Sequence, residues 1–157
     1  MKFAQLFLLI VLMTYNAIGQ TIPNNSKALD KQDFWTQKDL IQPAELAALI
    51  RNPKSNPIYI FNIGVVEDIK GAKKLGEASK KENLEKLNAA LKAIPKSSRI
   101  VIYCGCCPFD KCPNIRPAFN LMKNSGYSNG KLLNIPLNLK QDWISKGYPL
   151  NPKRRTS

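Results

Sequence analysis

The sequence predicts an α/β fold of three layers, with a mainly parallel central sheet flanked by helices on both faces. Two patterns in its 157 residues support this prediction. Short apolar runs with β-branched residues alternate with longer segments whose apolar residues recur every three or four positions. Such alternation is typical of parallel sheets, because each connecting helix crosses the sheet and packs against one face. No repeat or long linker interrupts the pattern, so we expect one domain.

Three segments are predicted to form strands, because β-branched and aromatic residues favour the pleated, buried surface of a sheet. Pro57 leads into the first of them, Ile58–Phe61. The second, Arg99–Tyr103, runs directly into a cysteine-rich segment, and a shorter third strand is predicted at Lys131–Leu133.

Four helices are predicted between and around these strands. Proline in a first turn and glycine after a last turn mark their ends, since proline lacks an amide hydrogen and glycine adopts left-handed conformations. One helix begins at Pro113, buries Ile115, Phe119 and Met122, and ends at Gly126. The other three are residues 44–51 behind Pro43, a helix from the capping-box pattern Ser79–Glu82 to Pro95, and residues 138–146 around Trp143, closed by Gly147.

The first 19 residues have the pattern of a secretory signal peptide. A positive charge at Lys2 precedes the apolar run Phe3–Met13, and the small residues Ala17 and Gly19 precede a cleavage site before Gln20. The apolar run is shorter than the roughly 20 residues that a membrane span needs, although an uncleaved anchor is the alternative. We therefore expect an exported protein, periplasmic or secreted, in a compartment where disulfides persist.

The rest of the chain divides by composition. Behind the signal peptide we expect an N-terminal extension at residues 20–37, one domain at residues 38–150 and a basic tail at residues 151–157. The extension is polar, except that Phe34 and Trp35 are predicted to dock onto the domain.

The charge and the absence of histidine limit the possible functions. The chain has 24 Lys and Arg against 11 Asp and Glu, a net charge of +13, and no His. Ser-His-Asp triads, Cys-His pairs and His-ligated zinc are therefore excluded. A strongly basic protein attracts small oxyanions, acidic proteins or anionic surfaces. Nucleic acid is not expected as a partner, because the basic residues are dispersed.

All four cysteines lie in one segment, Cys104–Cys112, between a predicted strand and a predicted helix. Ligands of α/β sheets bind at this position, where amide groups and the helix dipole favour an anion and so a thiolate. Lys111 and Arg116 add positive charge, which is expected to lower the pKa of a nearby thiol. The segment therefore predicts thiol chemistry.

Three other interpretations of the cysteines remain open. Structural disulfides fit the compartment, although loops this short contribute little chain entropy. Four thiolates could bind Zn²⁺ or Cu(I), although structural zinc sites normally use two separated pairs. Cys104–Cys107 is formally a CxxC redox motif, although little predicted sheet follows it.

The ordered set of motifs resembles the rhodanese-like domain family over most of residues 38–150. Ile100–Cys104 resembles the family's strand ending in the catalytic cysteine, and Arg116–Tyr127 resembles the helix after the active-site loop. Trp143 with Gly147–Pro149 resembles the terminal W…GYP signature. Upstream, Pro57–Ile63 and Asp68–Ala72 resemble the "LIDVR" strand and the "HIPGA" segment.

The chain departs from the family at several positions. Asn62 and Gly64 replace the usual Asp and Arg, and Asp68 replaces the His. The segment Ile135–Asn138 replaces a glycine pair, and the loop is longer, with three additional cysteines. Phe109 stands where the loop arginine is usual, five positions after the catalytic cysteine. No cysteine has an Arg six positions later, which disfavours the phosphatases that share this fold.

The resemblance implies a sulfurtransferase that carries sulfur as a persulfide on Cys104, with no metal or organic cofactor. It implies a small anionic sulfur donor and a thiol or sulfite-like acceptor, which could be a protein thiol. The alternative is a non-catalytic module that disulfides hold together. The residues expected to bind the anion are Gly105, Cys106, Cys107, Pro108 and Phe109, whose segment supplies backbone amide donors, together with Lys111 and Arg116. The residues expected to resolve the persulfide or to form disulfides are Cys106, Cys107 and Cys112.

Overall fold

The protein is described here by a computed structural model covering residues 35–53 and 57–152. The predicted signal peptide, the extension up to residue 34 (including Phe34) and the tail from residue 153 lie outside the described residues. Trp35 is buried in the core, as its predicted docking requires. Among the described residues, no helix is both long and apolar enough to cross a membrane.

Five parallel strands form one sheet in the order β1-β5-β4-β2-β3, with β4 at its centre. All three predicted strands are present, and β4 has the predicted bounds. Two further strands, β1 and β3, form the edges of the sheet. The bounds are β1 Leu40–Ile41, β2 Ile58–Asn62, β3 Ala72–Lys74, β4 Arg99–Tyr103 and β5 Gly130–Leu133.

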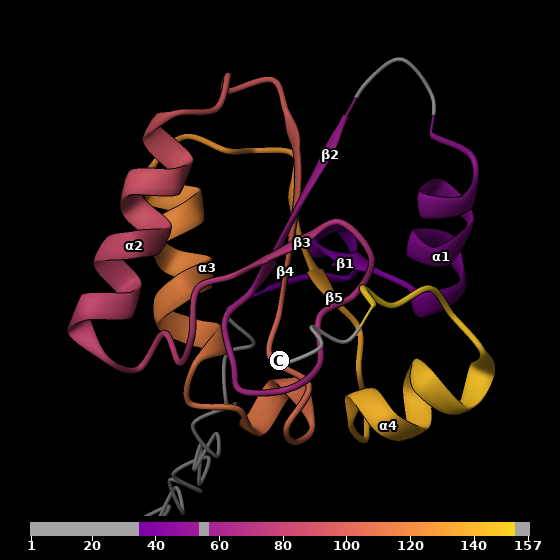
Figure 1. The fold of residues 1–157 in the computed structure, drawn as a ribbon. Helices are drawn as coiled ribbons and strands as arrows, with labels where there is room; N and C mark the ends of the chain where they lie inside the picture. The colour runs from indigo at the N-terminus through magenta and orange to yellow at the C-terminus, as the bar shows by residue number, and fades with distance from the viewer. Residues whose placement is uncertain (1–34, 54–56, 153–157) are drawn as a thin grey trace, which may run out of the picture. The chain divides into compact units, whose positions relative to one another are not determined.

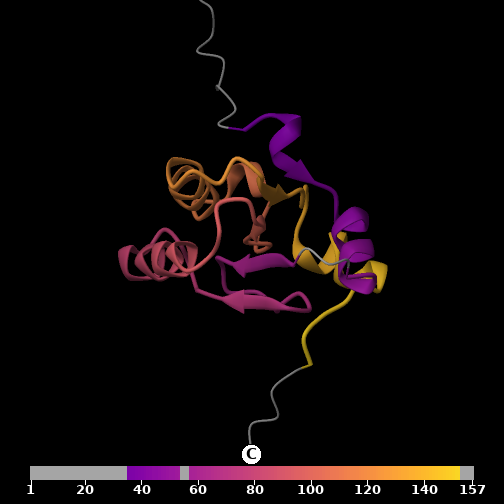
Figure 2. The same cartoon turned by 90° about the horizontal axis from the view of Figure 1, so that it is seen from above.

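Helices cover both faces of the sheet, as predicted. Helices α2 and α3 lie on one face, and α1 and α4 lie on the other (Figures 1 and 2). The bounds are α1 Pro43–Arg51, α2 Lys81–Lys92, α3 Ile115–Asn124 and α4 Leu139–Asp142, with 3-10 helices at Gln37–Asp39, Phe109–Lys111 and Ile144–Lys146.

The sheet separates two apolar clusters, and the alternation of side chains along β4 assigns each residue to one of them. Ile100 and Ile102 pack under α2 and α3, and Cys104 follows them on the same face. Val101 and Tyr103 pack under α1 and α4. The thiol of Cys104 therefore faces the start of α3 because of the two-residue period of the strand that precedes it.

The predicted capping box at Ser79–Glu82 is wrong. The N-cap of α2 is Lys80, and it makes no side-chain capping hydrogen bond. In a capping box the Glu82 carboxylate would accept the Ser79 amide hydrogen. That amide instead donates to Oδ1 of Asn114, 2.9 Å away. A tertiary hydrogen bond thus replaces the local one.

The predicted helix over residues 138–146 is also wrong as one element. It is divided at Trp143, whose φ and ψ of −128° and −59° are not helical. The turn breaks because Trp143 is fully buried and donates from Nε1 to the Pro149 carbonyl, 3.1 Å away. Gly147, at φ +67°, closes the segment as predicted.

Candidate active site

The carboxyl ends of β2 and β4 form the centre of the candidate site. From β2 the chain continues to β3 on one side, and from β4 it continues to β5 on the other. Ligands of parallel sheets bind at such a switch point, outside the carboxyl ends of the strands. Gly64 follows β2 and Cys104 follows β4, so both lie there. The Cys104 loop lies at the lower edge of the sheet in Figure 1.

Gly64 leaves the space that the Cys104 side chain occupies. A Cβ atom at Gly64 would lie 2.7 Å from Cys104 Sγ and 2.9 Å from the Cys104 carbonyl oxygen. Both separations are shorter than van der Waals contact, and one of them involves backbone. Any other residue at position 64 would therefore displace the thiol or the strand end.

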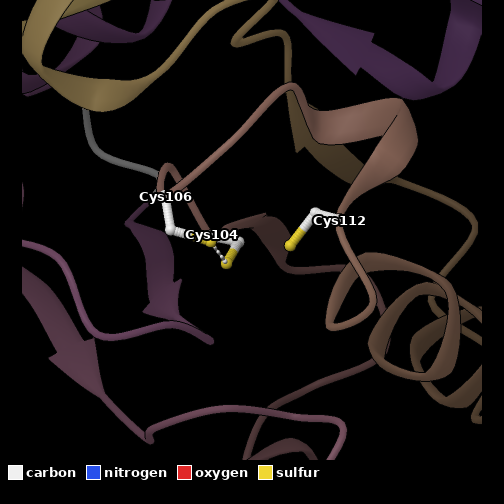
Figure 3. Close-up of side chains that lie close together, drawn as sticks. All are labelled: Cys104, Cys106 and Cys112. Atoms are coloured by element: carbon white, nitrogen blue, oxygen red, sulfur yellow. Dashed lines mark hydrogen bonds between the residues drawn. The ribbon is translucent and has the colours of Figure 1, made fainter.

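The sulfur of Cys104 lies among polar groups although its residue is only 1% exposed. Asn114, the N-cap of α3, donates from Nδ2 to Cys104 Sγ across 3.2 Å, and Cys106 Sγ lies 3.3 Å away. The sulfurs of Cys104, Cys106 and Cys112 all lie within 4.8 Å of one another, and they face each other in Figure 3. Three thiols from one loop thus meet at the end of the central strand.

These neighbours make Cys104 an acidic thiol. Its pKa falls from 9.0 to about 6, chiefly because the Cys112 thiol donates to it. Burial opposes this effect, and the Asn114 amide and the Cys106 amide and thiol assist it. The sequence predicts that cationic Lys111 and Arg116 produce the low pKa, whereas neutral hydrogen-bond donors are the leading cause in the structure.

The partner thiols shift in the opposite direction. Burial and the hydrogen bond to Cys104 raise the pKa of Cys106 to about 12. The hydrogen bond to Cys104 and burial likewise raise the pKa of Cys112. The cluster therefore holds one negative charge, on Cys104, at neutral pH. All four cysteines are free thiols in the structure, so the predicted disulfides remain a prediction.

The loop after Cys104 supplies only part of the predicted ring of amide donors. Gly105 has φ +77°, and a Cβ there would lie 2.8 Å from Cβ of Leu139, so the turn requires glycine. The Cys106 amide donates to Cys104. The predicted contribution of Phe109 is wrong, because its amide donates to the Ile135 carbonyl, 3.1 Å away. That bond ties the loop to the segment after β5.

Several predicted anion-binding residues share a cavity. Pro108, Phe109 and Lys111 line a separate cavity of about 720 Å³, together with Trp35 and Leu137. The rings of Trp35 and Phe109 lie against each other there, with their centroids 5.5 Å apart. The three thiols of the cluster do not line this cavity. The sequence prediction therefore combined two neighbouring features of the loop into one site.

Two other predicted residues have different positions. Cys107 lies next to the cluster, with its Sγ 3.4 Å from that of Cys106. Arg116 lies in the first turn of α3 and is half-buried.

Asn62 organises the loop that faces Cys104. Its Nδ2 donates to the Val66 carbonyl and to the Asp68 carboxylate, at 2.9 and 2.8 Å. Its Oδ1 accepts the Gly64 amide hydrogen at 3.0 Å. These three hydrogen bonds link Asn62 to Val66, Asp68 and Gly64 in the turn after β2. They hold Gly64 against Cys104.

Sequence reasoning missed two residues of this site. Asn114 follows Pro113 at the start of a predicted helix, which is a signal for an N-cap, although nothing local indicates that it binds a cysteine. Gly64 was noted only as a departure from the family pattern. Its role depends on the close approach of β2 and β4, which the sequence does not display.

No protein-family model and no curated protein matches the sequence. Several solved structures have a similar fold. A persulfide form of an EanB variant, in a tetrahedral intermediate state with ergothioneine, has a TM-score of 0.51 and 22% identity, covering 71% of this chain. An EanB variant with hercynine has a TM-score of 0.50 and 21% identity, covering 74% of this chain. The Saccharomyces cerevisiae single-domain sulfurtransferase RDL2 has a TM-score of 0.49 and 14% identity, covering 72% of this chain and 95% of its own.

The similarity concerns the fold. This chain spans only 27% and 29% of the two EanB chains, so their activity does not transfer with the similarity. The structure has a five-stranded parallel sheet with helices on both faces, and the cysteine-rich loop follows its central strand. This arrangement agrees with the predicted architecture. The described residues form a domain with the rhodanese-like fold.

Proposed function

We propose that this chain is an exported sulfurtransferase that carries sulfane sulfur as a persulfide on Cys104. The single observation that carries the proposal is the state of this thiol. A pKa of about 6 makes Cys104 mostly thiolate at neutral pH, and the thiolate is the nucleophilic form of cysteine. The EanB structures support the class of chemistry, because one of them has a persulfide cysteine.

The proposed donor is thiosulfate or a similar small anion. The Cys104 thiolate attacks the outer sulfur of thiosulfate, the sulfur–sulfur bond breaks, and its electron pair leaves with sulfite. The products are a Cys104 persulfide and sulfite, so no external oxidant or reductant is required. Asn114 Nδ2 and the Cys106 amide, which donate to Cys104, stabilise negative charge at the reacting sulfur.

In the second step a thiophilic acceptor attacks the outer sulfur of the persulfide. Cyanide, sulfite or a thiolate forms the new bond, and Cys104 leaves as a thiolate. A low pKa assists this step as well, because a less basic thiolate is a better leaving group. The net charge of +13 favours the approach of anionic donors and acceptors.

Intact mass of the purified protein tests the proposal. Incubation with thiosulfate is expected to add one sulfur atom, and a reductant is expected to remove it. Cys104→Ser is expected to gain no sulfur, and Ser79→Ala, which keeps the Ser79 amide bond to Asn114, serves as a matched control. Failure of the wild-type protein to gain sulfur, or a normal gain by Cys104→Ser, would contradict the proposed function.

Export is tested separately. Expression of the full chain with its first 19 residues is expected to yield a protein that begins at Gln20. Recovery of the intact N-terminus would contradict export by a cleaved signal peptide.

A second candidate function, capture of a soft metal ion, is favoured by the three sulfurs within 4.8 Å. Thiolates select ions such as Cu(I) or Zn²⁺. Equilibrium dialysis of the reduced protein against each metal, with Cys112→Ser as the comparison, distinguishes this candidate. Stoichiometric binding that Cys112→Ser loses would support it, and no binding would exclude it.

A further inference from the structure

The cysteine cluster connects a buried sulfur to the protein surface. Cys104 is 1% exposed, and Gly64 packs closely against its sulfur. Cys106 is exposed, although its Sγ lies only 3.3 Å from that of Cys104. Figure 3 shows these two sulfurs facing each other, with Cys104 between Cys106 and Cys112. Cys106 is therefore the thiol through which a sulfur on Cys104 can reach the surface.

The other two cysteines do not combine these properties. Cys112 faces the same cluster but is only 3% exposed, so a sulfur moved to it would stay inside the protein. Cys107 lies beyond Cys106, at 3.4 Å from its sulfur, and is not part of the group of three sulfurs around Cys104. Among the four cysteines, all of which are described, only Cys106 contacts Cys104 and is also exposed.

We propose that Cys106 is a second sulfur carrier, which takes the sulfane sulfur from Cys104 and presents it to a protein thiol. This inference rests on the proposed function, because it requires a persulfide on Cys104. It adds a catalytic residue and a class of acceptor to that function.

The transfer balances without a further reactant. The Cys106 sulfur bonds to the outer sulfur of the Cys104 persulfide, and the sulfur–sulfur bond on Cys104 breaks. The electron pair of that bond stays on Cys104, which becomes a thiolate. The proton of the Cys106 thiol passes to the transferred sulfur. Cys106 is now the persulfide, and a protein thiolate removes its outer sulfur and leaves Cys106 as a thiolate.

The hydrogen bond that Asn114 donates to Cys104 favours transfer in this direction. Asn114 Nδ2 lies 3.2 Å from Cys104 Sγ, so it stabilises the negative charge that the transfer leaves on Cys104. In sulfur exchange a better stabilised thiolate leaves faster. The cluster therefore receives sulfur at the buried thiol and passes it to the exposed one.

The positions of the sulfurs indicate the acceptor. A small nucleophile such as cyanide can enter an enclosed site, whereas a thiol on a folded protein needs a sulfur that stands at the surface. Cys106 provides that sulfur on a chain with a net charge of +13, which favours acceptors with an acidic surface.

The test compares two acceptors after loading the cysteines with sulfur. Wild-type protein, Cys106→Ser and the control Ser128→Ala, at an exposed position before β5, are loaded from thiosulfate and, in parallel, from sodium tetrasulfide. Sulfur transfer is then measured to cyanide and to a small acidic carrier protein with one exposed cysteine. Cys106→Ser is expected to lower the ratio of protein transfer to cyanide transfer by about tenfold or more, whereas Ser128→Ala keeps the wild-type ratio.

Mapping of the loaded protein locates the sulfur directly. After alkylation and digestion, wild-type protein is expected to show persulfide on Cys104 and Cys106, and Cys106→Ser only on Cys104. Cys104→Ser is expected to show none on Cys106 after thiosulfate, since Cys104 is the proposed entry point.

Each failure has a distinct outcome. An unchanged acceptor ratio in Cys106→Ser, with persulfide on Cys104, overturns the relay and leaves the proposed function standing. Release of sulfide with a mass two hydrogens below the free thiols also overturns it, because Cys106 would then have attacked the inner sulfur to form a disulfide. No sulfur gain from either donor overturns both proposals.

Discussion

Replacing Asn114 by aspartate isolates the hydrogen bond that the side-chain amide donates to Cys104. The substitution keeps the shape of the side chain and an oxygen for the Ser79 amide, which Asn114 Oδ1 accepts at 2.9 Å. It replaces the Nδ2 donor, 3.2 Å from Cys104 Sγ, by a carboxylate oxygen. We therefore expect a folded protein whose Cys104 thiolate has lost a donor and gained a negative neighbour.

The expected change follows from the strength of one hydrogen bond to a charged group. Such a bond contributes about 1.5–3 kcal/mol, which corresponds to about 1–2 pKa units before any repulsion from the carboxylate. The pKa of Cys104 should then rise from about 6 to about 8 or above. At pH 7 the thiolate share of Cys104 should fall from about nine tenths to about one tenth.

The assay is the initial rate of Cys104 alkylation by iodoacetamide as a function of pH. Trypsin releases Cys104 in the peptide Ile100–Lys111 with two other cysteines, so fragmentation of this peptide assigns the modified sulfur. Asn120→Asp, at an exposed position of α3, introduces the same charge on the same helix and should keep the wild-type midpoint. A wild-type midpoint for Asn114→Asp would refute the assignment of part of the low pKa to the Asn114 side chain.

Three further predictions concern stability. The lowered pKa of Cys104 contributes stability above pH 9 that is lost as pH falls through 6, while the raised pKa values of Cys106 and Cys112 oppose folding above pH 9. The urea concentration at the midpoint of unfolding should therefore rise from pH 6 to 9, and the rise should be smaller in Cys104→Ser. An equal dependence on pH in the two proteins would contradict this prediction. Gly64→Ala should lower the free energy of unfolding by about 1–3 kcal/mol through overpacking, which is measured as a lower melting temperature. An unchanged melting temperature would show that the ends of β2 and β4 move to accommodate the methyl group. Trp143→Ala should cost about 3–5 kcal/mol in denaturant unfolding, yet leave the Cys104 alkylation midpoint unchanged in the folded protein, because Trp143 packs on the opposite face of the sheet.

Local sequence patterns predict some strands of the sheet and not others. Apolar, β-branched composition was sufficient for Arg99–Tyr103, since a central strand is buried on both faces. The strands Leu40–Ile41 and Ala72–Lys74 were not predicted, because two or three residues are too few to show the alternation of apolar and polar side chains. In the second strand, Lys73 and Lys74 are also exposed. These edge strands exist through pairing with β5 and β2, which is a tertiary property.

The helix ends show the competition between local and tertiary hydrogen bonds. Gly126 ends α3 as predicted, with φ +85°, because the left-handed conformation depends on the residue itself. The predicted capping box at Ser79–Glu82 does not form, because the Ser79 amide donates to Asn114 of a distant segment instead. The same asparagine holds the Cys104 thiolate, so the missed contact belongs to the candidate site.

The sequence by itself determined the class of the fold, the central strand and the segment that carries the chemistry. It did so because burial and backbone preference act over a few neighbouring residues, and because all four cysteines follow one strand. Only the tertiary structure decided which cysteine is acidic and which is exposed. Those properties depend on Gly64 after β2 and on Cys112 and Asn114 before α3, which folding brings to one sulfur from two separate segments. Electrostatics and burial depend on distance in space, which the order of residues does not specify.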